Sequence, residues 1–177
     1  MSSVVPLREC LPLSAREKQL ADEHPDSCAQ EIVPGLFLGP FTCLRDQETI
    51  QRCRLEYVVN LSARCSCIAK QLGVAHIMDV MIEDEVNANI MVHLPAIYAF
   101  IDAALDSGVN VLVNCAMGIS RSGTAVVGYL MHKHNWSVDE SLLYVKQRRA
   151  CVAPNPGFLI QLTHQRLPTL DEIENME

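Results

Sequence analysis

The sequence has no apolar run long enough to cross a membrane and no excess of positive charge. Its 177 residues carry 14 Lys and Arg against 21 Asp and Glu, a formal net charge of −7. A transmembrane helix needs about 20 consecutive apolar residues, and nucleic acids and anionic lipid surfaces attract basic proteins. We therefore expect neither nucleic acid nor a membrane to be the main partner. Internal repeats and low-complexity runs are also absent.

The length and composition predict one globular α/β domain. Apolar residues make up 49% of the chain, which is enough to bury a sizeable core. β-Branched segments alternate with helical ones, an order typical of a central, mostly parallel sheet flanked by helices. The predicted strands are Leu36–Leu38, Tyr57–Leu61, His76–Val80 and Val109–Val113, and the predicted helices are Asp46–Arg52, Ile90–Asp106, Arg121–His134, Val138–Arg149 and Gly157–Arg166.

The predicted domain covers residues 31–168. Residues 1–30 are polar and irregular and form an expected N-terminal extension, with a short helix at Ala15–Glu23 as its candidate element; residues 169–177 are an acidic tail. Ser137 and Glu140 have the spacing of a capping box, which predicts a helix start there. The N-terminus lacks the pattern of a secretory signal, and Ser2 stands where myristoylation requires glycine.

The segment 109–124 points most directly to chemistry. A β-branched run predicts a strand that places Cys115 on a short loop of small, uncharged residues, and a helix begins at Arg121. Gly118 permits the close backbone approach that an anion-binding loop needs. The loop amides and the helix N-terminus are expected to surround a phosphate. The phosphate-binding residues are then Ala116, Met117, Gly118, Ile119, Ser120 and Arg121.

Three side chains make this loop a candidate catalytic centre. Aligned amides, a helix N-terminus and a guanidinium favour a thiolate at Cys115, which is therefore a candidate nucleophile that forms a phosphocysteine intermediate. Arg121 offers a planar pair of donors to two phosphate oxygens. Ser122 can point its hydroxyl at the sulfur and stabilise it as a leaving group.

The Cys-x5-Arg spacing alone carries little information. Cys10 and Arg16 have the same separation, but no strand precedes them, no glycine lies between them, and Pro12 removes one amide. We interpret that pair as accidental. The alternative for Cys115 is a buried cysteine at a strand end, which the glycine, the Ser-Arg-Ser ending and the following helix disfavour.

Cys115 to Arg121 resembles the Cys-x5-Arg loop of the cysteine-dependent protein tyrosine phosphatases, in the Cys-x-x-Gly-x-Ser-Arg-Ser form of their dual-specificity branch. The likeness runs from about Glu31 to Leu167. Its opening segment is most similar to the STYX group, pseudophosphatases that lack the nucleophile, whereas Cys115 is retained here. The segments that carry the likeness outside the loop are Glu31–Pro40, Gly128–Met131, Arg148–Arg149 with Cys151, and Pro154–Phe158.

The resemblance implies a protein phosphatase without metal or cofactor, in a reducing compartment such as cytosol or nucleus, because a catalytic thiolate must stay reduced. Cys65 and Cys67 are expected to be loop cysteines, since two ligands do not make a zinc site. Asn114 departs from the family, which has a histidine before the nucleophile that hydrogen-bonds the loop and helps to hold the thiolate. Asparagine cannot carry a charge, so we expect Asn114 to support the loop while turnover is reduced.

The resemblance also places a general acid some thirty residues before the nucleophile. Asp84 fits this position best, Glu83 and Glu85 are the alternatives, and Asp79 is expected at a strand end. An acidic loop is often simply solvated. In the catalytic interpretation Asp84 protonates the leaving oxygen and then activates the water that hydrolyses the intermediate.

The expected partner is a phosphorylated protein. The loop has no lysine, whereas relatives that act on inositol phospholipids often carry basic residues there, and nothing resembles the extra loop that deepens the pocket of tyrosine-specific members. The basic cluster Lys146, Arg148 and Arg149 is expected to compensate a helix C-terminus or to contact an acidic partner. Two functions stay open: a dual-specificity phosphatase, and a weakly active or inactive STYX-like module that binds phosphoproteins.

Overall fold

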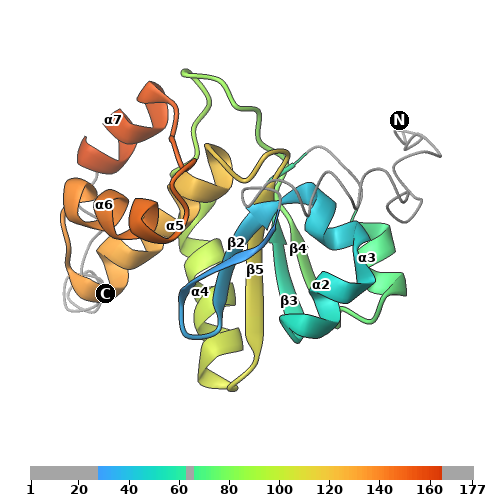
Figure 1. Cartoon of the computed structure of the whole chain (residues 1–177). Coiled ribbons are helices and arrows are strands. Elements are labelled where there is room, and N and C mark those ends of the chain that lie inside the picture. Colours follow the sequence, from blue (N-terminus) through green and yellow to red (C-terminus); the bar gives the residue numbers. More distant parts are fainter. Residues whose placement is uncertain (1–27, 63–65, 165–177) are drawn as a thin grey trace, which may run out of the picture.

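The computed structural model describes residues 28–62 and 66–164. These residues form a five-stranded sheet with helices on both faces (Figure 1). The strand order is β1-β2-β5-β3-β4. Among the strands of these described residues, only β1 is antiparallel to its neighbour, so the prediction of a mostly parallel sheet flanked by helices is confirmed. The strands are β1 (Gln30–Val33), β2 (Leu36–Pro40), β3 (Leu55–Asn60), β4 (His76–Asp79) and β5 (Asn110–Cys115).

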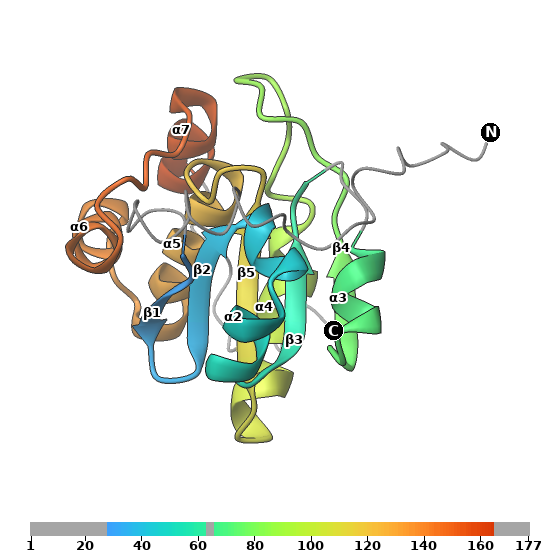
Figure 2. The ribbon, with the colours of Figure 1, turned by 45° about the vertical axis from the view of Figure 1, so that its right-hand side comes forward.

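Alternating side chains of the central strand β5 enter two separate cores. Val111, Val113 and Cys115 face a cluster formed with the helices on one side, and Leu112 faces a smaller cluster on the other. Figure 2 shows α2 in front of the sheet and α4 behind it. The larger cluster includes α4 (Leu94–Asp106), α5 (Arg121–His134), α6 (Val138–Arg148) and α7 (Pro156–His164), and the smaller one includes η3 (Phe41–Arg45), α2 (Gln47–Arg52) and α3 (Cys67–Gln71).

Several predicted boundaries needed correction. The helix predicted from Ile90 begins at Leu94, because residues 91–93 form a turn and Pro95 occupies the first helical turn, where its missing N–H breaks no hydrogen bond. The prediction that Cys67 lies in a loop was wrong, since it is the first residue of α3. β1, η3 and α3 are too short to give a periodic pattern, which is why the sequence did not reveal them.

Some sequence predictions fall outside the described residues. They concern the helix at Ala15–Glu23, the pair Cys10 and Arg16, the cysteine at position 65 and the acidic tail.

The predicted capping box starts α6. Ser137 Oγ accepts a hydrogen bond from the N–H of Glu140 at 3.3 Å, and Glu140 Oε2 accepts one from the N–H of Ser137 at 2.8 Å. Hydrogen bonds from Ser137 hold the pKa of Glu140 below its ordinary value. This capping box fixes the residue at which α6 begins. The helix in turn sets the position of Arg149, the residue that follows its last turn.

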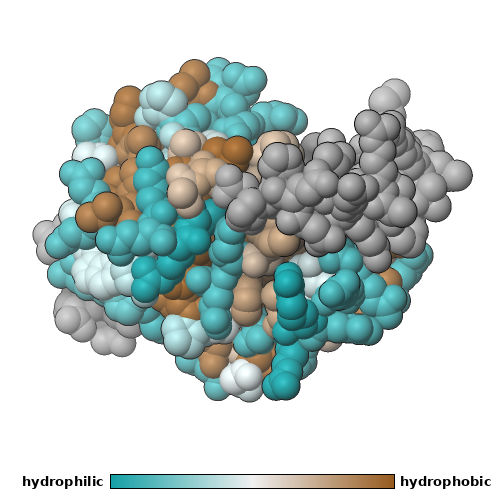
Figure 3. Space-filling model, viewed as in Figure 1, coloured by the Kyte–Doolittle hydropathy of each residue, from teal (hydrophilic) through white to brown (hydrophobic). Residues whose placement is uncertain are grey.

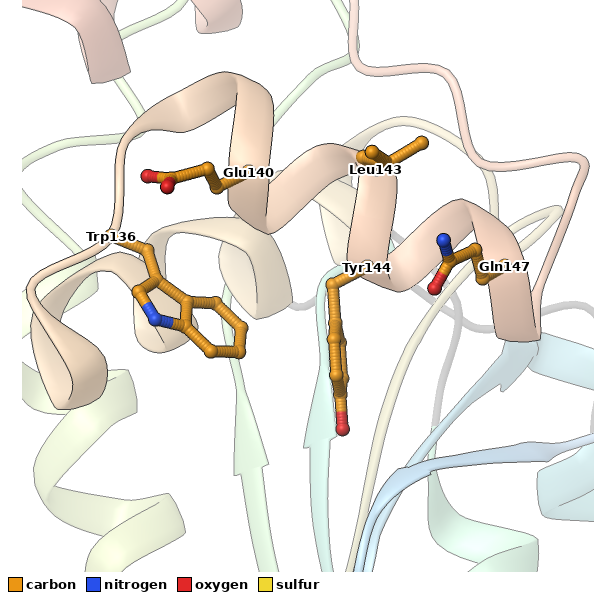
Figure 4. A pocket seen from close by; sticks show the side chains of 5 residues that line it. All are labelled: Trp136, Glu140, Leu143, Tyr144 and Gln147. Atoms are coloured by element: carbon orange, nitrogen blue, oxygen red, sulfur yellow. The ribbon is translucent and has the colours of Figure 1, made fainter.

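The outer surface of α6 and α7 carries exposed apolar side chains. Leu143 is 61% exposed and Ile160 is 56% exposed, and Figure 3 shows apolar surface on the side where these helices lie. A cavity of about 280 Å³ opens beside α6 (Figure 4); it is lined by Trp136, Glu140, Leu143, Tyr144 and Gln147. Among the described helices, none is both long and apolar enough to cross a membrane.

Truncation of the buried central leucine tests the smaller core. Leu112 is fully buried between the neighbouring strands, so Leu112→Ala is expected to lower the free energy of unfolding by about 2–5 kcal/mol through lost contacts and a cavity. Leu143→Ala is the matched control on the exposed face, with an expected change of about 0.5 kcal/mol or less. Urea unfolding measures both, and equal losses would contradict the assignment of Leu112 to a core.

Candidate active site

The predicted phosphate loop lies at the carboxyl end of the central strand. Cys115 ends β5, and Arg121 begins α5 (Figure 1). The carboxyl edge of a parallel sheet is where α/β proteins bind ligands. Cys115 is 2% exposed, and the hydroxyl of buried Ser122 donates a hydrogen bond to its Sγ at 3.1 Å. The structure therefore brings together the thiol, the hydroxyl and a helix N-terminus, as the sequence predicts.

The loop turns its carbonyl groups outward. The carbonyl oxygens of residues 116–119 each accept a hydrogen bond from outside the loop. The donors are the N–H of Phe41 to Ala116 (3.3 Å), Arg149 Nη2 to Met117 (3.2 Å), Arg149 Nε to Gly118 (2.8 Å) and the N–H of Ala153 to Ile119 (3.1 Å). A trans peptide group places its N–H opposite its C=O. The N–H groups of residues 117–120 therefore face the inner side, where an anion would bind.

Glycine is required at position 118 for two reasons. Gly118 has a φ of +66°, and a Cβ there would lie 2.5 Å from the carbonyl carbon of Gly39. A larger residue would be strained and would push the loop off the end of β2. The predicted role of Gly118 thus has a specific cause, the close approach of two backbones.

Arg149 holds the loop from outside, which overturns the prediction that it compensates a helix C-terminus or contacts an acidic partner. Its side chain is 1% exposed. Besides the two loop carbonyls, Nη1 donates to the carbonyl of Cys28 at 3.1 Å and to Gln30 Oε1. The sequence suggested a helix-end role because Arg149 follows α6, but the guanidinium instead ties the loop to the segment entering β1.

Arg121 has an unpaired donor in the site. Its Nη1 donates to the carbonyl of Ile82 at 3.1 Å, and its Nε is buried without a hydrogen-bond acceptor among the described residues. Asp84 Oδ2 lies 3.8 Å from that Nε, beyond hydrogen-bond distance. An unsatisfied buried donor costs about 1–3 kcal/mol. A bound oxyanion would accept from this N–H and remove that cost.

Asp84 lies at the rim of the loop. Its Oδ1 accepts hydrogen bonds from Ser120 Oγ at 2.6 Å and from Asn155 Nδ2 at 2.9 Å, and its side chain is 36% exposed. Its neighbours Glu83 and Glu85 are exposed. Of the three predicted carboxylates, Asp84 is the one that the described contacts bring to the loop.

Helix α7 holds the segment that carries Asp84. Gln161 Nε2 donates to the carbonyl of Ala88 at 2.7 Å, and Gln161 Oε1 accepts from the N–H of Ile90 at 3.0 Å. A Cβ at Gly157 would lie 1.9 Å from the carbonyl oxygen of Val86, so only glycine permits this approach. These contacts fix Asp84 over the loop by means of residues some seventy positions later in the chain.

Asn114 points toward a neighbouring strand. It is fully buried, and its Nδ2 donates to Asn60 Oδ1 at 3.0 Å, while its backbone carbonyl accepts from the N–H of Leu61 at 2.7 Å. Its described side-chain hydrogen bond therefore supports the end of β5 and is not directed to the loop backbone.

Sequence reasoning missed four polar residues that shape the site: Asn60, Arg149, Asn155 and Gln161. The turn Pro154–Phe158 did contribute to the family resemblance, and Asn155 lies within it. Its N–H donates to Ser120 Oγ at 3.0 Å, and its Oδ1 accepts from the N–H of Phe158 at 3.0 Å. Arg149 also lies in a segment that carries the resemblance, but neither that likeness nor any pattern links Arg149, Asn60 or Gln161 to the loop, because their contacts form only in the folded chain.

Replacement of Arg149 tests whether it shapes the loop. Lysine keeps the charge but lacks the fork that reaches two carbonyls, so Arg149→Lys is expected to weaken vanadate binding at least tenfold and to lower the free energy of unfolding by about 2–4 kcal/mol. Arg148→Lys is the matched control, because Arg148 lies over the Tyr144 ring on the surface. Calorimetric titration with vanadate measures binding, and equal effects in the two variants would contradict the role of Arg149.

Comparisons with known proteins agree with this geometry. The family described as "Dual specificity phosphatase, catalytic domain" matches residues 36–166. The chain is 34% identical over 142 residues to Protein phosphatase Slingshot homolog 3 of Rattus norvegicus, covering 80% of this chain and 22% of the relative. It is 38% identical over 132 residues to Dual specificity protein phosphatase 2 of Mus musculus, covering 75% of this chain and 41% of the relative.

A solved structure with a similar fold is the human tyrosine phosphatase-like serine/threonine/tyrosine-interacting protein. The TM-score is 0.69 at 29% identity, covering 85% of this chain and 97% of that one. The chain spans less than half the length of the two curated relatives above. The family match nevertheless extends over most of the chain, from β2 through α7. The chain therefore belongs to the dual-specificity phosphatases of the protein tyrosine phosphatase superfamily.

Proposed function

We propose that the chain is an active protein phosphatase that hydrolyses phosphotyrosine and phosphoserine or phosphothreonine through a phosphocysteine intermediate on Cys115. The observation that carries this proposal is the position of Asp84. Its carboxylate is hydrogen-bonded to Ser120 of the loop, 3.8 Å from the Arg121 guanidinium, while the thiol lies at the start of the same loop. A nucleophile, an anion site and an acid thus surround one small volume.

The first chemical step transfers the phosphoryl group to sulfur. The Cys115 thiolate attacks phosphorus, the bond from phosphorus to the ester oxygen breaks, and Asp84 gives that oxygen its proton. The inward amides of residues 117–120 and the Arg121 guanidinium hold the remaining phosphate oxygens through the transition state. The Nε of Arg121, which has no hydrogen-bond acceptor among the described residues, supports this role.

The second step releases phosphate. Asp84, now a carboxylate, takes a proton from water as the water oxygen attacks phosphorus, and the bond from sulfur to phosphorus breaks. The departing thiolate accepts a hydrogen bond from Ser122 Oγ, which already lies 3.1 Å from Sγ. The proton count closes, because Asp84 ends the cycle protonated as it began.

Phosphorylated proteins are the proposed substrates, and the proposed site of action is the cytosol or nucleus. Met117, the loop residue with the most exposed apolar side chain, is 65% exposed, and no lysine lies in the loop. A rim of this kind favours contact with a polypeptide over contact with a multiply charged lipid headgroup. The net charge of −7 likewise favours neither nucleic acid nor an anionic membrane.

A weakly active or inactive phosphoprotein-binding module is the second candidate. Asn114 in place of histidine favours it, and so does the similarity to the human serine/threonine/tyrosine-interacting protein. The retained Cys115 and the placement of Asp84 favour catalysis.

Turnover of an aryl phosphate separates the two candidates. Cys115→Ser is expected to abolish turnover, Asp84→Asn to lower kcat about 10²–10³-fold, and Asn114→His to raise kcat because an imidazole can bear charge. Glu83→Gln is the matched acidic control, with kcat expected within twofold of wild type. Wild-type turnover no higher than that of Cys115→Ser would refute the proposed enzymatic activity. Vanadate binding by such an inactive wild-type protein would support the binding module.

A further inference from the structure

Asp79 lies at the outer end of a row of hydrogen-bonded side chains that leads to the residue before the nucleophile. Asn60 Nδ2 donates to Asp79 Oδ1 at 2.7 Å, and Asn114 Nδ2 donates to Asn60 Oδ1 at 3.0 Å. The sheet register produces this row, because Asn60 of β3 is paired with Asp79 of β4 on one side and with Asn114 of β5 on the other. Side chains paired in register lie on the same face of a sheet.

The carboxylate of Asp79 determines the direction in which hydrogen bonds are donated along the row. Asp79 can only accept hydrogen bonds when ionised, so Asn60 must turn its amide nitrogen toward Asp79 and its oxygen toward Asn114. Asn114 must then turn its nitrogen toward Asn60. Two hydroxyl groups reinforce this arrangement, since Ser66 Oγ donates to Asp79 Oδ2 at 2.8 Å and Ser62 Oγ donates to Asn60 Oδ1 at 2.7 Å.

The inner end of the row contains a buried acceptor that no described residue satisfies. Asn114 is fully buried, and its Oδ1 has no donor among the described residues. A buried acceptor without a donor costs about 1–3 kcal/mol, so the amide would rotate or shift if its nitrogen were not held. Because Cys115 is the next residue, any such shift moves the start of the phosphate-binding loop.

We propose that Asp79 and Asn60 are positioning residues for catalysis, which hold Asn114 and thereby keep Cys115 and the first loop amides in reactive geometry. This inference rests on the proposed phosphatase activity. Asp79 contributes without touching substrate. Small displacements of a reacting group lower the rate strongly even when substrate binding is retained, so kcat is expected to respond more than KM.

Variants of Asp79 test the row from its exposed end, where substitution disturbs the core least. Asp79→Ala is expected to lower kcat for an aryl phosphate about tenfold with KM changed less than about twofold, and to slow alkylation of Cys115 by iodoacetamide. Asp79→Asn keeps an oxygen acceptor for Asn60, and Ser62 Oγ still donates to Asn60 Oδ1 and so keeps the direction of the row. Both rates are expected to stay within about twofold of wild type. Asp79→Val, which suits a strand end, repeats the test if the alanine variant folds poorly.

Asp102→Ala is the matched control. Asp102 is another carboxylate with two hydrogen-bond donors, Tyr129 Oη and Lys133 Nζ, both at 2.8 Å, but it lies on α4 and its donors lie on α5. Its kcat and alkylation rate are expected to equal those of wild type.

Two outcomes overturn the proposal. One is an Asp79→Ala enzyme with unchanged kcat and unchanged alkylation rate. The other is an Asp79→Asn enzyme as impaired as Asp79→Ala, which would assign the effect to charge and not to the hydrogen-bonded row. If the wild type shows no turnover, the proposed function fails separately, and the alkylation rate alone decides: slower alkylation of Asp79→Ala supports the row, and an equal rate overturns it.

Discussion

One buried guanidinium determines the shape of the phosphate-binding loop. Arg149 donates to the carbonyls of Met117 and Gly118, and to the carbonyl of Cys28 and the side chain of Gln30. Burial of a charged group is costly unless its donors are satisfied, so the loop carbonyls are needed by Arg149 as much as Arg149 is needed by the loop. The inward amides follow from those outward carbonyls. Anion binding at this site therefore depends on a residue that an anion need not touch.

The remaining supports come from different directions and act on different parts of the loop. The row from Asp79 to Asn114 meets the loop where it leaves β5, and Gly118 lies against the backbone of Gly39 at the end of β2. Asn155 and helix α7 place Asp84 over the loop. Each support is a polar or backbone contact between segments far apart in the chain. The sheet supplies the common frame, because its strand ends bring these segments to one edge.

The sequence revealed what depends on local pattern. The β-branched run before Cys115, Gly118 in the loop and the capping box of α6 each have a short-range cause, and the structure contains all three features. Long-range partners were beyond that reasoning. The sequence predicts a helix-end role for Arg149 because it follows a helix, whereas its partners in the loop lie 31 and 32 residues earlier and two other partners lie 119 and 121 residues earlier. Only the family resemblance points to Asp84, since an acidic loop alone does not specify which carboxylate faces a site.

A covalent phosphocysteine is the feature that separates an enzyme from a binding module with the same loop. Rapid acid quenching of the protein during turnover of a phosphotyrosine peptide, followed by mass spectrometry, detects it directly. We expect the peptide that contains Cys115 to gain the mass of one phosphoryl group, and the corresponding peptide of Cys115→Ser to gain none. Turnover of the peptide without any phosphoryl group on Cys115, under conditions that preserve a phosphocysteine standard, would contradict the proposed mechanism.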